Sequence, residues 1–486
     1  VTFAAILLSI SALISRLLGL FRDRLLAGQF GASRELDVYF TAFRIPDFVY
    51  GILIIGGISA VFLPVFSEYF NKKEEEAWKL VNNILNCFLV LLILICGIFA
   101  IFTPLLVNLI VPGFSPEQKI LAISLTRIMF LSPIFFGLSS VFSGVLHYFN
   151  RFLAYSIAPI LYNLSIIFGI LFLFPIFGLL GLVYGVILGA VFHWLIQIPA
   201  ARNSGFHYLP TLNFSHPGLK KIFKLMIPRS IGSVIYQLNL IILTAIASTL
   251  AVGSITIFNF SDNLQSFPIG IIGVSFALAS FPFLSRAWAN GQKTEFLESF
   301  YSTLRQILFL IIPISVFFFL LRVQLVRLIL GTGQFGWLEI KLTAAGLGLF
   351  CLGLFAQASI PFLARVFYSF QDTKTPFFIG LTSMTLNVSL AFFFVWLLSF
   401  PNLFQELIRN ILKLQGIENI AVIGLPLALS ISGIFQFFLL LIFLRKRIGT
   451  FRFREIFDSF KKIVIASFLM AVSLFLGLKI GAIFFD

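Results

Sequence analysis

The sequence is poor in charged residues, which make up 11% of its 486 residues, while hydrophobic residues make up 59%. Soluble globular chains carry about 25% charged residues, and no single core of such a chain could bury this much apolar surface. The composition therefore predicts an integral membrane protein. It excludes a water-soluble enzyme, a nucleic-acid-binding module and a secreted disulfide scaffold, so we expect no nucleic-acid partner.

Cysteine is also scarce, and Cys87, Cys96 and Cys351 all lie inside apolar runs. An odd number of such cysteines argues against a disulfide framework or a metal site. The four histidines are scattered, and the sequence has neither a GxxxxGK(S/T) phosphate loop nor a catalytic Ser/His/Asp or HExxH arrangement. We therefore expect no metal, no cofactor and no enzymatic activity, and we predict a protein that binds or transports its ligand.

Long apolar runs predict thirteen transmembrane helices, because about 20 apolar residues are needed to cross the bilayer. The runs lie near 3–30, 36–68, 80–111, 118–147, 152–175, 178–200, 219–250, 255–284, 298–330, 339–369, 375–399, 420–444 and 460–484. We assign eighteen Lys and Arg residues to the even-numbered connections and the span ends beside them, against five to the odd-numbered ones. The positive-inside rule therefore places the N-terminus in the cytoplasm and, with anionic lipid head groups, explains the net charge of +15. No cleavable signal peptide is expected, since the first apolar run continues into charged sequence.

The two halves of the chain resemble each other. FLPVFSEYF around Pro64 matches SFPFLSRAW around Pro282, and LYNLS around Asn163 matches TLNVS around Asn387, at an offset of about 220 residues. Chance similarity between Leu- and Phe-rich helices is the alternative. Repeats of six spans keep the same orientation, so their axis runs along the membrane normal. We predict an all-α polytopic membrane protein with an N-terminal six-helix lobe over 1–200, a cytoplasmic linker over 201–218, a C-terminal six-helix lobe over 219–448 and an extra C-terminal helix over 449–486.

Ionisable groups in the first span mark a candidate site, because such groups are costly in a membrane unless they face a cavity or a partner. Ser15 and Arg22 share one stripe of the helix, and Arg16 and Asp23 share an adjacent one. Gly19 lies between these stripes and leaves room for a ligand or a neighbouring helix. The first span therefore contributes two cations to the candidate site.

The second span places four polar side chains on one stripe: Asp37, Thr41, Arg44 and Asp47. Pro46 should bend this helix. Together the two spans predict a cationic concavity suited to an anionic phosphate. The alternative is that Arg16–Asp23 and Arg44–Asp47 are structural ion pairs.

The equivalent helices of the second half carry fewer charges. Arg229 shares a stripe with Ser233 and Tyr236, and it is a candidate cationic contact. Asn263 belongs to a polar stripe that also contains Asn259, Asp262 and Ser266. We interpret this second stripe as a polar cavity wall, with interhelical hydrogen bonding as the alternative.

Several strings resemble the MurJ (MviN) family of the multidrug/oligosaccharidyl-lipid/polysaccharide flippase superfamily. They are SRLLGLFRD at 15–23, FGASRELDVYFTAFRIPD at 30–47, NFSDNLQSFPIGIIGVSFALASFPFLS at 259–285 and YSFQDTKTP at 368–376. The resemblance runs in order through essentially the whole chain. It implies a lipid II flippase of peptidoglycan synthesis in the bacterial inner membrane, which acts by alternating access without ATP. Membrane lipids and cell-wall synthases are the expected partners.

The resemblance also implies which residues contact the substrate. Arg16, Arg22, Asp23 and Asp37 match functionally important positions of the family. A pyrophosphate would sit against Arg16, Arg22 and Arg44, and the full expected substrate site comprises Arg16, Arg22, Asp23, Asp37, Arg44, Arg229 and Asn263. No metal belongs to this site.

The chain departs from the family at positions that bear on this site. Family arginines fall on Tyr50 and Asn263, and a family glutamate falls on Ile55, so the hypothesis is that Arg44 and Arg229 compensate. Acidic sodium ligands of some members fall on Leu243 and Ala391, which predicts no sodium site of that kind. The family has fourteen spans, so the last of its helices is expected to be absent from this sequence.

The departures leave two alternatives open. The first is a flippase for another polyprenyl-pyrophosphate-linked glycan, which the missing arginines favour. The second is a non-transporting membrane scaffold, which would not need to retain costly charges in its spans. A drug or cation antiporter would require a cavity rich in acids, whereas this one is rich in arginine.

Overall fold

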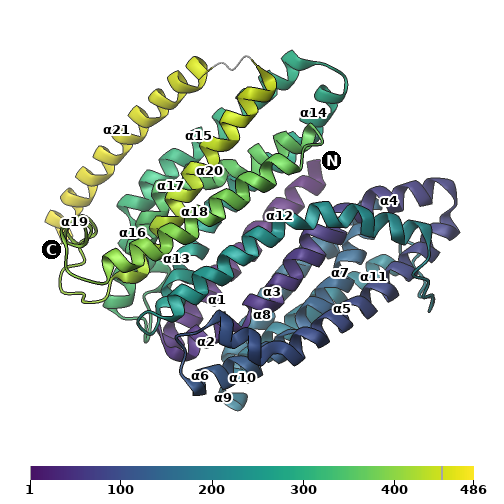
Figure 1. Cartoon of the computed structure of the whole chain (residues 1–486), viewed down its shortest axis with the longest axis horizontal. Coiled ribbons are helices and arrows are strands. Elements are labelled where there is room, and N and C mark those ends of the chain that lie inside the picture. The colour runs from purple at the N-terminus through teal and green to yellow at the C-terminus, as the bar shows by residue number, and fades with distance from the viewer. Residues whose placement is uncertain (1, 450–452, 486) are drawn as a thin grey trace. The chain divides into compact units, whose positions relative to one another are not determined.

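The computed structural model describes the backbone of residues 2–449 and 453–485, and their side chains except at 2–6, 55–57, 59–60, 228–229, 231, 453–457 and 478–485. Within these described residues, all regular structure is helical (Figure 1). The predicted all-α fold is therefore confirmed. The chain forms two compact units.

The first unit comprises Val1–Ile255 together with Thr332–Phe335. Its helices are α1 (Thr2–Phe30), α2 (Arg34–Ala42), α3 (Arg44–Tyr50), η1 (Gly51–Ile58), α4 (Ser59–Lys72), α5 (Glu74–Ile110), α6 (Pro116–Met129), α7 (Leu131–Tyr148), α8 (Phe152–Phe168), η2 (Gly169–Leu173), α9 (Phe174–Phe177), α10 (Leu179–Leu195), α11 (Gln197–Arg202) and α12 (Pro217–Ser248). In this unit α8 packs between α1 and α10, and α12 packs along η1.

The second unit comprises Thr256–Gly331 and Gly336–Asp486. Its helices are α13 (Ser254–Pro268), η3 (Ile269–Val274), α14 (Ser275–Ala289), α15 (Lys293–Leu320), α16 (Arg322–Leu330), α17 (Trp337–Ser369), α18 (Lys374–Leu398), α19 (Leu403–Leu412), η4 (Ala421–Ile423), α20 (Gly424–Ile448) and α21 (Phe453–Phe485). Helix α17 is the centre of this unit and packs against α14, α15, α16 and α20, while α21 packs along α15 (Figure 1).

Ten helical segments of the described residues are long and apolar enough to cross a membrane, or eleven if the bent helix α12 counts as one span. The segments do not include α1 or the run from α2 to α4. Each of the thirteen predicted ranges nevertheless coincides with one helix or with consecutive helices. The total of thirteen spans stays a prediction. Helix α19 lies in a connection for which the sequence predicted no helix.

Two spans contain a π-helix at matching positions of the two halves. The π-helices η1 and η3 start at Gly51 and Ile269, which are separated by the same 218 residues as Pro64 and Pro282. A π-helix is rare and often marks a functional position. This correspondence supports the internal repeat. The lobes over 1–200 and 219–448 remain a proposal, because the two compact units divide after Ile255, beyond the predicted linker.

Asparagines on α5 hold the predicted linker along its backbone. Asn82 donates to the His207 carbonyl at 2.9 Å and accepts from the Leu209 N–H at 2.8 Å. Asn83 pairs in the same way with the backbone of Asn213, at 2.9 and 2.6 Å. Both asparagine side chains are buried. The linker is therefore an ordered strap on the first unit, because side-chain amides satisfy backbone groups that no helix or sheet satisfies.

We expect Asn82→Leu to destabilise the first unit. The change keeps the branched shape of the side chain but adds bulk at a buried position, and it leaves a backbone N–H and a carbonyl without partners, at a cost of about 1–3 kcal/mol. The apparent Tm of the purified protein should fall, and limited proteolysis within 206–216 should become faster. Asn290→Leu, at an exposed helix end, is the matched control. Equal Tm values for the two variants would contradict a strapped linker.

The motif QDTKTP caps a helix and joins two helices of the second unit. Asp372 accepts from the Thr375 N–H at 3.0 Å and from its hydroxyl at 2.8 Å, and it pairs with Arg447 of α20 at 2.9 Å. Burial disfavours the ionised carboxyl, but these hydrogen bonds and the Arg447 charge outweigh burial and lower the pKa of Asp372. The motif therefore fixes the start of α18 against the end of α20.

Candidate anion-binding site

An ion pair on α1 joins two sequence neighbours, Arg22 and Asp23. Nε and Nη2 of Arg22 both donate to Asp23 Oδ1, at 3.0 and 2.8 Å. The Asp23 side chain is 4% exposed, whereas that of Arg22 is 23% exposed. The counter-ion is thus buried, while the arginine side chain stays partly exposed. Such a guanidinium is suited to a second, external anion, because its planar fork presents several N–H groups at once.

Asn163 on α8 holds this arginine from a neighbouring helix. Its Oδ1 accepts a long hydrogen bond from Arg22 Nη1 at 3.4 Å, and its Nδ2 donates to Ser15 O and Ser15 Oγ, both at 3.2 Å. Ser15 and Arg22, which the sequence places on one stripe, therefore meet the same side chain. A Cβ added at Gly19 would lie 3.8 Å from Asn163 Oδ1. The space beside Gly19 is thus filled by the neighbouring helix.

Glycines of α10 let α8 approach closely and position residues 162–163. A Cβ at Gly185 would lie 2.8 Å from Gly169 Cα, and a Cβ at Gly189 would lie 2.7 Å from the Tyr162 ring. Both distances are too short for any other residue without a shift of the helices. Close packing through small residues is typical of helix pairs in membranes. The sequence of α10 therefore determines where the partner of Arg22 stands.

Arg44 lies at a break in the second predicted span. Helix α2 ends at Ala42 and α3 begins at Arg44, two residues before Pro46, and this break corresponds to the predicted bend. The Arg44 side chain is buried, and its Nε donates to Thr244 Oγ1 of α12 at 2.8 Å. Arg44 therefore links α3 to α12 within the first unit.

Asp37 makes a contact that positions helices. The carboxylate is buried, and its Oδ2 accepts from the Gly253 N–H at 2.7 Å. Gly253 has a φ of +86°, and a Cβ there would lie 2.3 Å from the Ala32 carbonyl oxygen. Only glycine fits this close approach. Asp37 therefore ties α2 to the connection after α12, a role that does not require contact with the substrate.

Tyr50 belongs to an aromatic cluster. Its ring centroid is 5.1 Å from that of Phe136 on α7, which in turn is 5.2 Å from that of Tyr162 on α8. Tyr162 lies within electrostatic reach of both Asp47 and Arg22. Tyr50 stands where the resemblance predicts an arginine. It thus contributes an aromatic ring to the cluster near the Arg22–Asp23 ion pair and no positive charge.

The other predicted site residues are described in less detail by the structure. Arg16 is half-buried on α1. Arg229 falls within α12, but its side chain lies outside the described residues. Asn263 lies on α13, which belongs largely to the second unit. The structure therefore joins Arg22, Asp23 and Arg44 to partners inside the first unit.

Two partners in this site were not predicted from the sequence. Asn163 appears in the sequence as part of the repeated LYNLS string, and this repeat was the available signal for it. Thr244 has no such signal, because a threonine in an apolar helix is common and its distance from Arg44 along the chain is large. Within the described side chains, no group of three or more His, Cys, Asp or Glu residues could hold a metal.

The chain matches the family described as Lipid II flippase MurJ over residues 26–483. It is 32% identical over 484 residues to a probable lipid II flippase MurJ of Buchnera aphidicola subsp. Acyrthosiphon pisum, covering 98% of this chain and 90% of the relative. It is 30% identical over 373 residues to the lipid II flippase MurJ of Burkholderia cenocepacia, covering 75% of this chain and 72% of the relative.

Solved structures are similar over the same length. A lipid II flippase MurJ in an inward closed conformation matches with a TM-score of 0.78 at 28% identity, covering 97% of this chain and 93% of that chain. An inward-facing multidrug resistance MATE transporter of the MOP superfamily matches with a TM-score of 0.72 at 16% identity, covering 92% and 98%. The second similarity shows the fold alone.

Proposed function

Since this chain belongs to the lipid II flippase MurJ family, we propose that it moves lipid II from the cytoplasmic to the outer leaflet of the bacterial inner membrane. The protein is a multi-pass membrane protein of a transporter family. Transport of this kind changes the position of the substrate and breaks no covalent bond. The proposal places the N-terminus in the cytoplasm, on the positive-inside distribution of Lys and Arg.

The observation that carries the proposal is the partly exposed side chain of Arg22 beside its buried counter-ion, Asp23. A pyrophosphate offers several oxygens in reach of one guanidinium fork, and in a low-dielectric site such charge-assisted hydrogen bonds are strong. Asn163 holds the guanidinium so that little side-chain entropy is lost on binding. Arg44 contributes a second cation, and Arg16, Arg229 and Asn263 complete the proposed substrate contacts.

Alternating access follows from electrostatics in this proposal. Burying cations without an external anion costs free energy, so binding of the pyrophosphate favours the conformation in which the substrate site is closed. After the head group leaves, the closed conformation is again unfavourable. The lipid tail stays in the bilayer, where it needs no binding energy to remain. Cell-wall synthases that consume lipid II are the proposed partners on the outer side.

One observation favours a second candidate, a flippase for another polyprenyl-pyrophosphate-linked glycan. Tyr50 packs into an aromatic cluster where the resemblance predicts an arginine. An aromatic wall binds the apolar faces of sugar rings, whereas an arginine binds phosphate or carboxylate. The two candidates share the pyrophosphate and differ in the glycan.

Rescue of a bacterium depleted of its own lipid II flippase tests the proposal. We expect the chain to restore growth and cell-wall synthesis, and accessible lipid II should reappear in the outer leaflet. Tyr50→Phe should rescue equally well, since it preserves the aromatic cluster. Failure of the parent chain, with normal membrane insertion, would overturn lipid II as the substrate. The same assay in a strain lacking a flippase for a different polyprenyl-linked glycan then tests the second candidate.

A further inference from the structure

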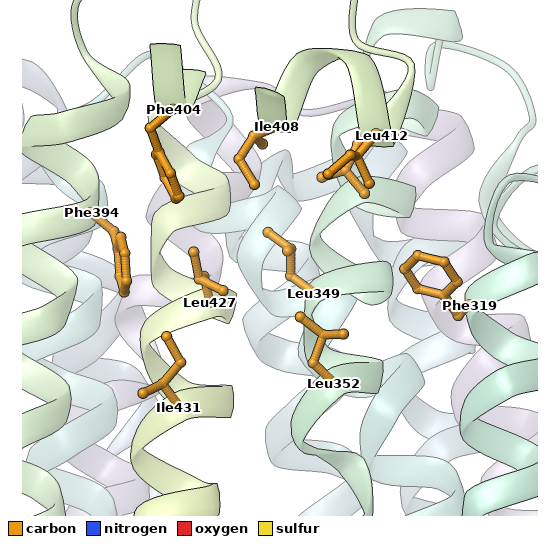
Figure 2. A pocket seen from close by; sticks show the side chains of 10 residues that line it. Phe319, Leu349, Leu352, Phe394, Phe404, Ile408, Leu412, Leu427 and Ile431 are labelled. Carbon is orange, nitrogen blue, oxygen red and sulfur yellow. The ribbon is translucent and has the colours of Figure 1, made fainter. Parts of the chain in front are cut away.

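A cavity lies in the second unit, under helix α19. It has a volume of about 320 Å³ and is lined only by apolar side chains (Figure 2). Phe404, Ile408 and Leu412 of α19 cover it, and Leu349 and Leu427 of α17 and α20 lie beneath them (Figure 2). A cavity of this size is large enough for a small-molecule group. Its lining offers no hydrogen-bonding group to water, so its ligand must be apolar.

Three lining residues give the cavity an open side. Leu352, Ile411 and Ile431 are 49%, 53% and 37% exposed. They lie on α17, α19 and α20, and α17 and α20 are long and apolar enough to cross a membrane. In a membrane protein, surface of this kind meets lipid chains. The cavity is therefore open to the hydrocarbon of the bilayer.

Helix α19 has one broad apolar face, opposite Glu406 and Asn410. Part of this face covers the cavity, and the adjoining stripe exposes Leu403 and Leu407, at 86% and 55%. The helix is anchored at its start, where Asn402 Oδ1 accepts from the Gln405 N–H at 2.9 Å and Gln405 Nε2 donates to the Leu398 carbonyl at 2.8 Å. Exposed leucines on a short anchored helix are typical of a segment lying in the lipid interface.

Cations adjoin the lining residues. Arg322 lies over the ring of the lining Phe319 at 4.9 Å and donates from Nη1 to its carbonyl at 2.7 Å. Arg409 follows the lining Ile408, and its Nη2 donates to the Glu418 carbonyl at 3.0 Å. The buried Nε atoms of both arginines have no hydrogen-bond partner among the described residues. Both guanidinium groups therefore place positive charge beside the lining of the cavity.

The charge around the cavity is positive. Lys413 is exposed at the end of α19, directly after the lining Leu412, and adds a third cation. The acidic groups on the same segment are the exposed Glu406 and Glu418. Three cations against two acids, with both acids directed to solvent, favour an anionic head group.

We propose that this cavity binds one acyl chain of an anionic glycerophospholipid. The acyl chain fills the apolar cavity under α19, and the phosphate of the lipid lies near Arg409 and Arg322. All residues of this site belong to the second unit, and none of them is among the proposed substrate contacts. It therefore takes a structural or regulatory lipid, and the proposed transport function is not required for it.

The test reconstitutes the full chain in nanodiscs of phosphatidylethanolamine that contain a minor fraction of phosphatidylglycerol with a diazirine at mid-chain. After photolysis, cross-linked peptides are located by mass spectrometry. We expect cross-links on α19 and on the segments around Leu349 and Leu427. No cross-links at these segments in the parent chain would overturn the proposal without reference to any variant.

Variants of the cavity test the position of the bound acyl chain. Leu427→Trp fills the cavity, and cross-linking there should fall about tenfold because the burial of several methylene groups is lost. Ile442→Trp, at an exposed position on the same helix, is the matched control and should change nothing. Ile411→Asp tests the same point at the open side, where it places a carboxylate beside the path of the acyl chain. Undiminished cross-linking in both Leu427→Trp and Ile411→Asp would overturn the site.

The head group is tested separately. Phosphatidylcholine with the same diazirine chain should cross-link several-fold less than phosphatidylglycerol, and Arg409→Gln should remove most of that difference. Equal yields from the two lipids in the parent chain would overturn the anionic preference. Displacement of the probe by added polyprenyl phosphate would overturn the assignment to a glycerophospholipid. Growth rescue is not a readout in these experiments, so their failure and failure of the proposed transport function are distinguishable.

Discussion

The double variant Arg22→Ala/Asp23→Asn should fold and insert like the parent chain but support no transport. Removing both partners of a buried ion pair leaves no buried charge unpaired, so it costs much less stability than removing one partner. The substrate, in contrast, loses the proposed cationic contact, whose side chain is the partly exposed member of the pair. Loss of charge-assisted hydrogen bonds to a pyrophosphate costs about 2–3 kcal/mol, or roughly a hundredfold in affinity.

The measurements are growth rescue in the flippase-depleted strain and the apparent Tm of the purified variant. Arg34→Ala, at an exposed position near the start of α2, is the matched control and should rescue fully. If Arg22 and Asp23 formed only a structural pair, the double variant would still transport the substrate and rescue growth. Rescue by the double variant at normal abundance would therefore refute the proposed role of Arg22.

The single variant Asp23→Asn should give the largest loss of stability. It leaves the Arg22 guanidinium without its counter-ion, while the acceptor atoms of Ser15 and Asn163 cannot replace a full negative charge. Breaking a buried pair in this way costs about 3–5 kcal/mol. Since Arg22 keeps 23% of its side chain exposed, we expect the lower end, about 3 kcal/mol. In a chain of this length that loss lowers the apparent Tm by roughly 3 °C.

Thermal unfolding of the purified protein in detergent measures this effect. Asp458→Asn is the matched control, because it makes the same chemical change at an exposed carboxylate and should shift the Tm little. Combining Arg22→Ala with Asp23→Asn should recover most of the lost stability, since the two effects are coupled through one contact. If the loss of Tm in the double variant equalled the sum of the losses in the single variants, Arg22 and Asp23 would not be energetically coupled.

Composition and periodicity determined the class of protein and the place of its helices. Apolar runs of about 20 residues have few alternatives to a membrane helix, because every backbone group in a bilayer must be hydrogen-bonded internally. For the same reason the thirteen predicted ranges coincide with helices. Ionisable groups in such runs are costly, so Arg22, Asp23 and Arg44 were identifiable as candidate site residues from their position alone.

Tertiary structure alone decided the partners of these residues. Asp23 pairs with the adjacent Arg22, and Arg44 donates to Thr244, 200 residues away along the chain. Helical spacing gives the direction of a side chain but not the neighbour it meets, which depends on how closely helices pack. The close approach at the glycines of α10 and the cavity under α19 could not be predicted from the sequence for the same reason. Both depend on how separate helices pack together, which no single stretch of sequence encodes.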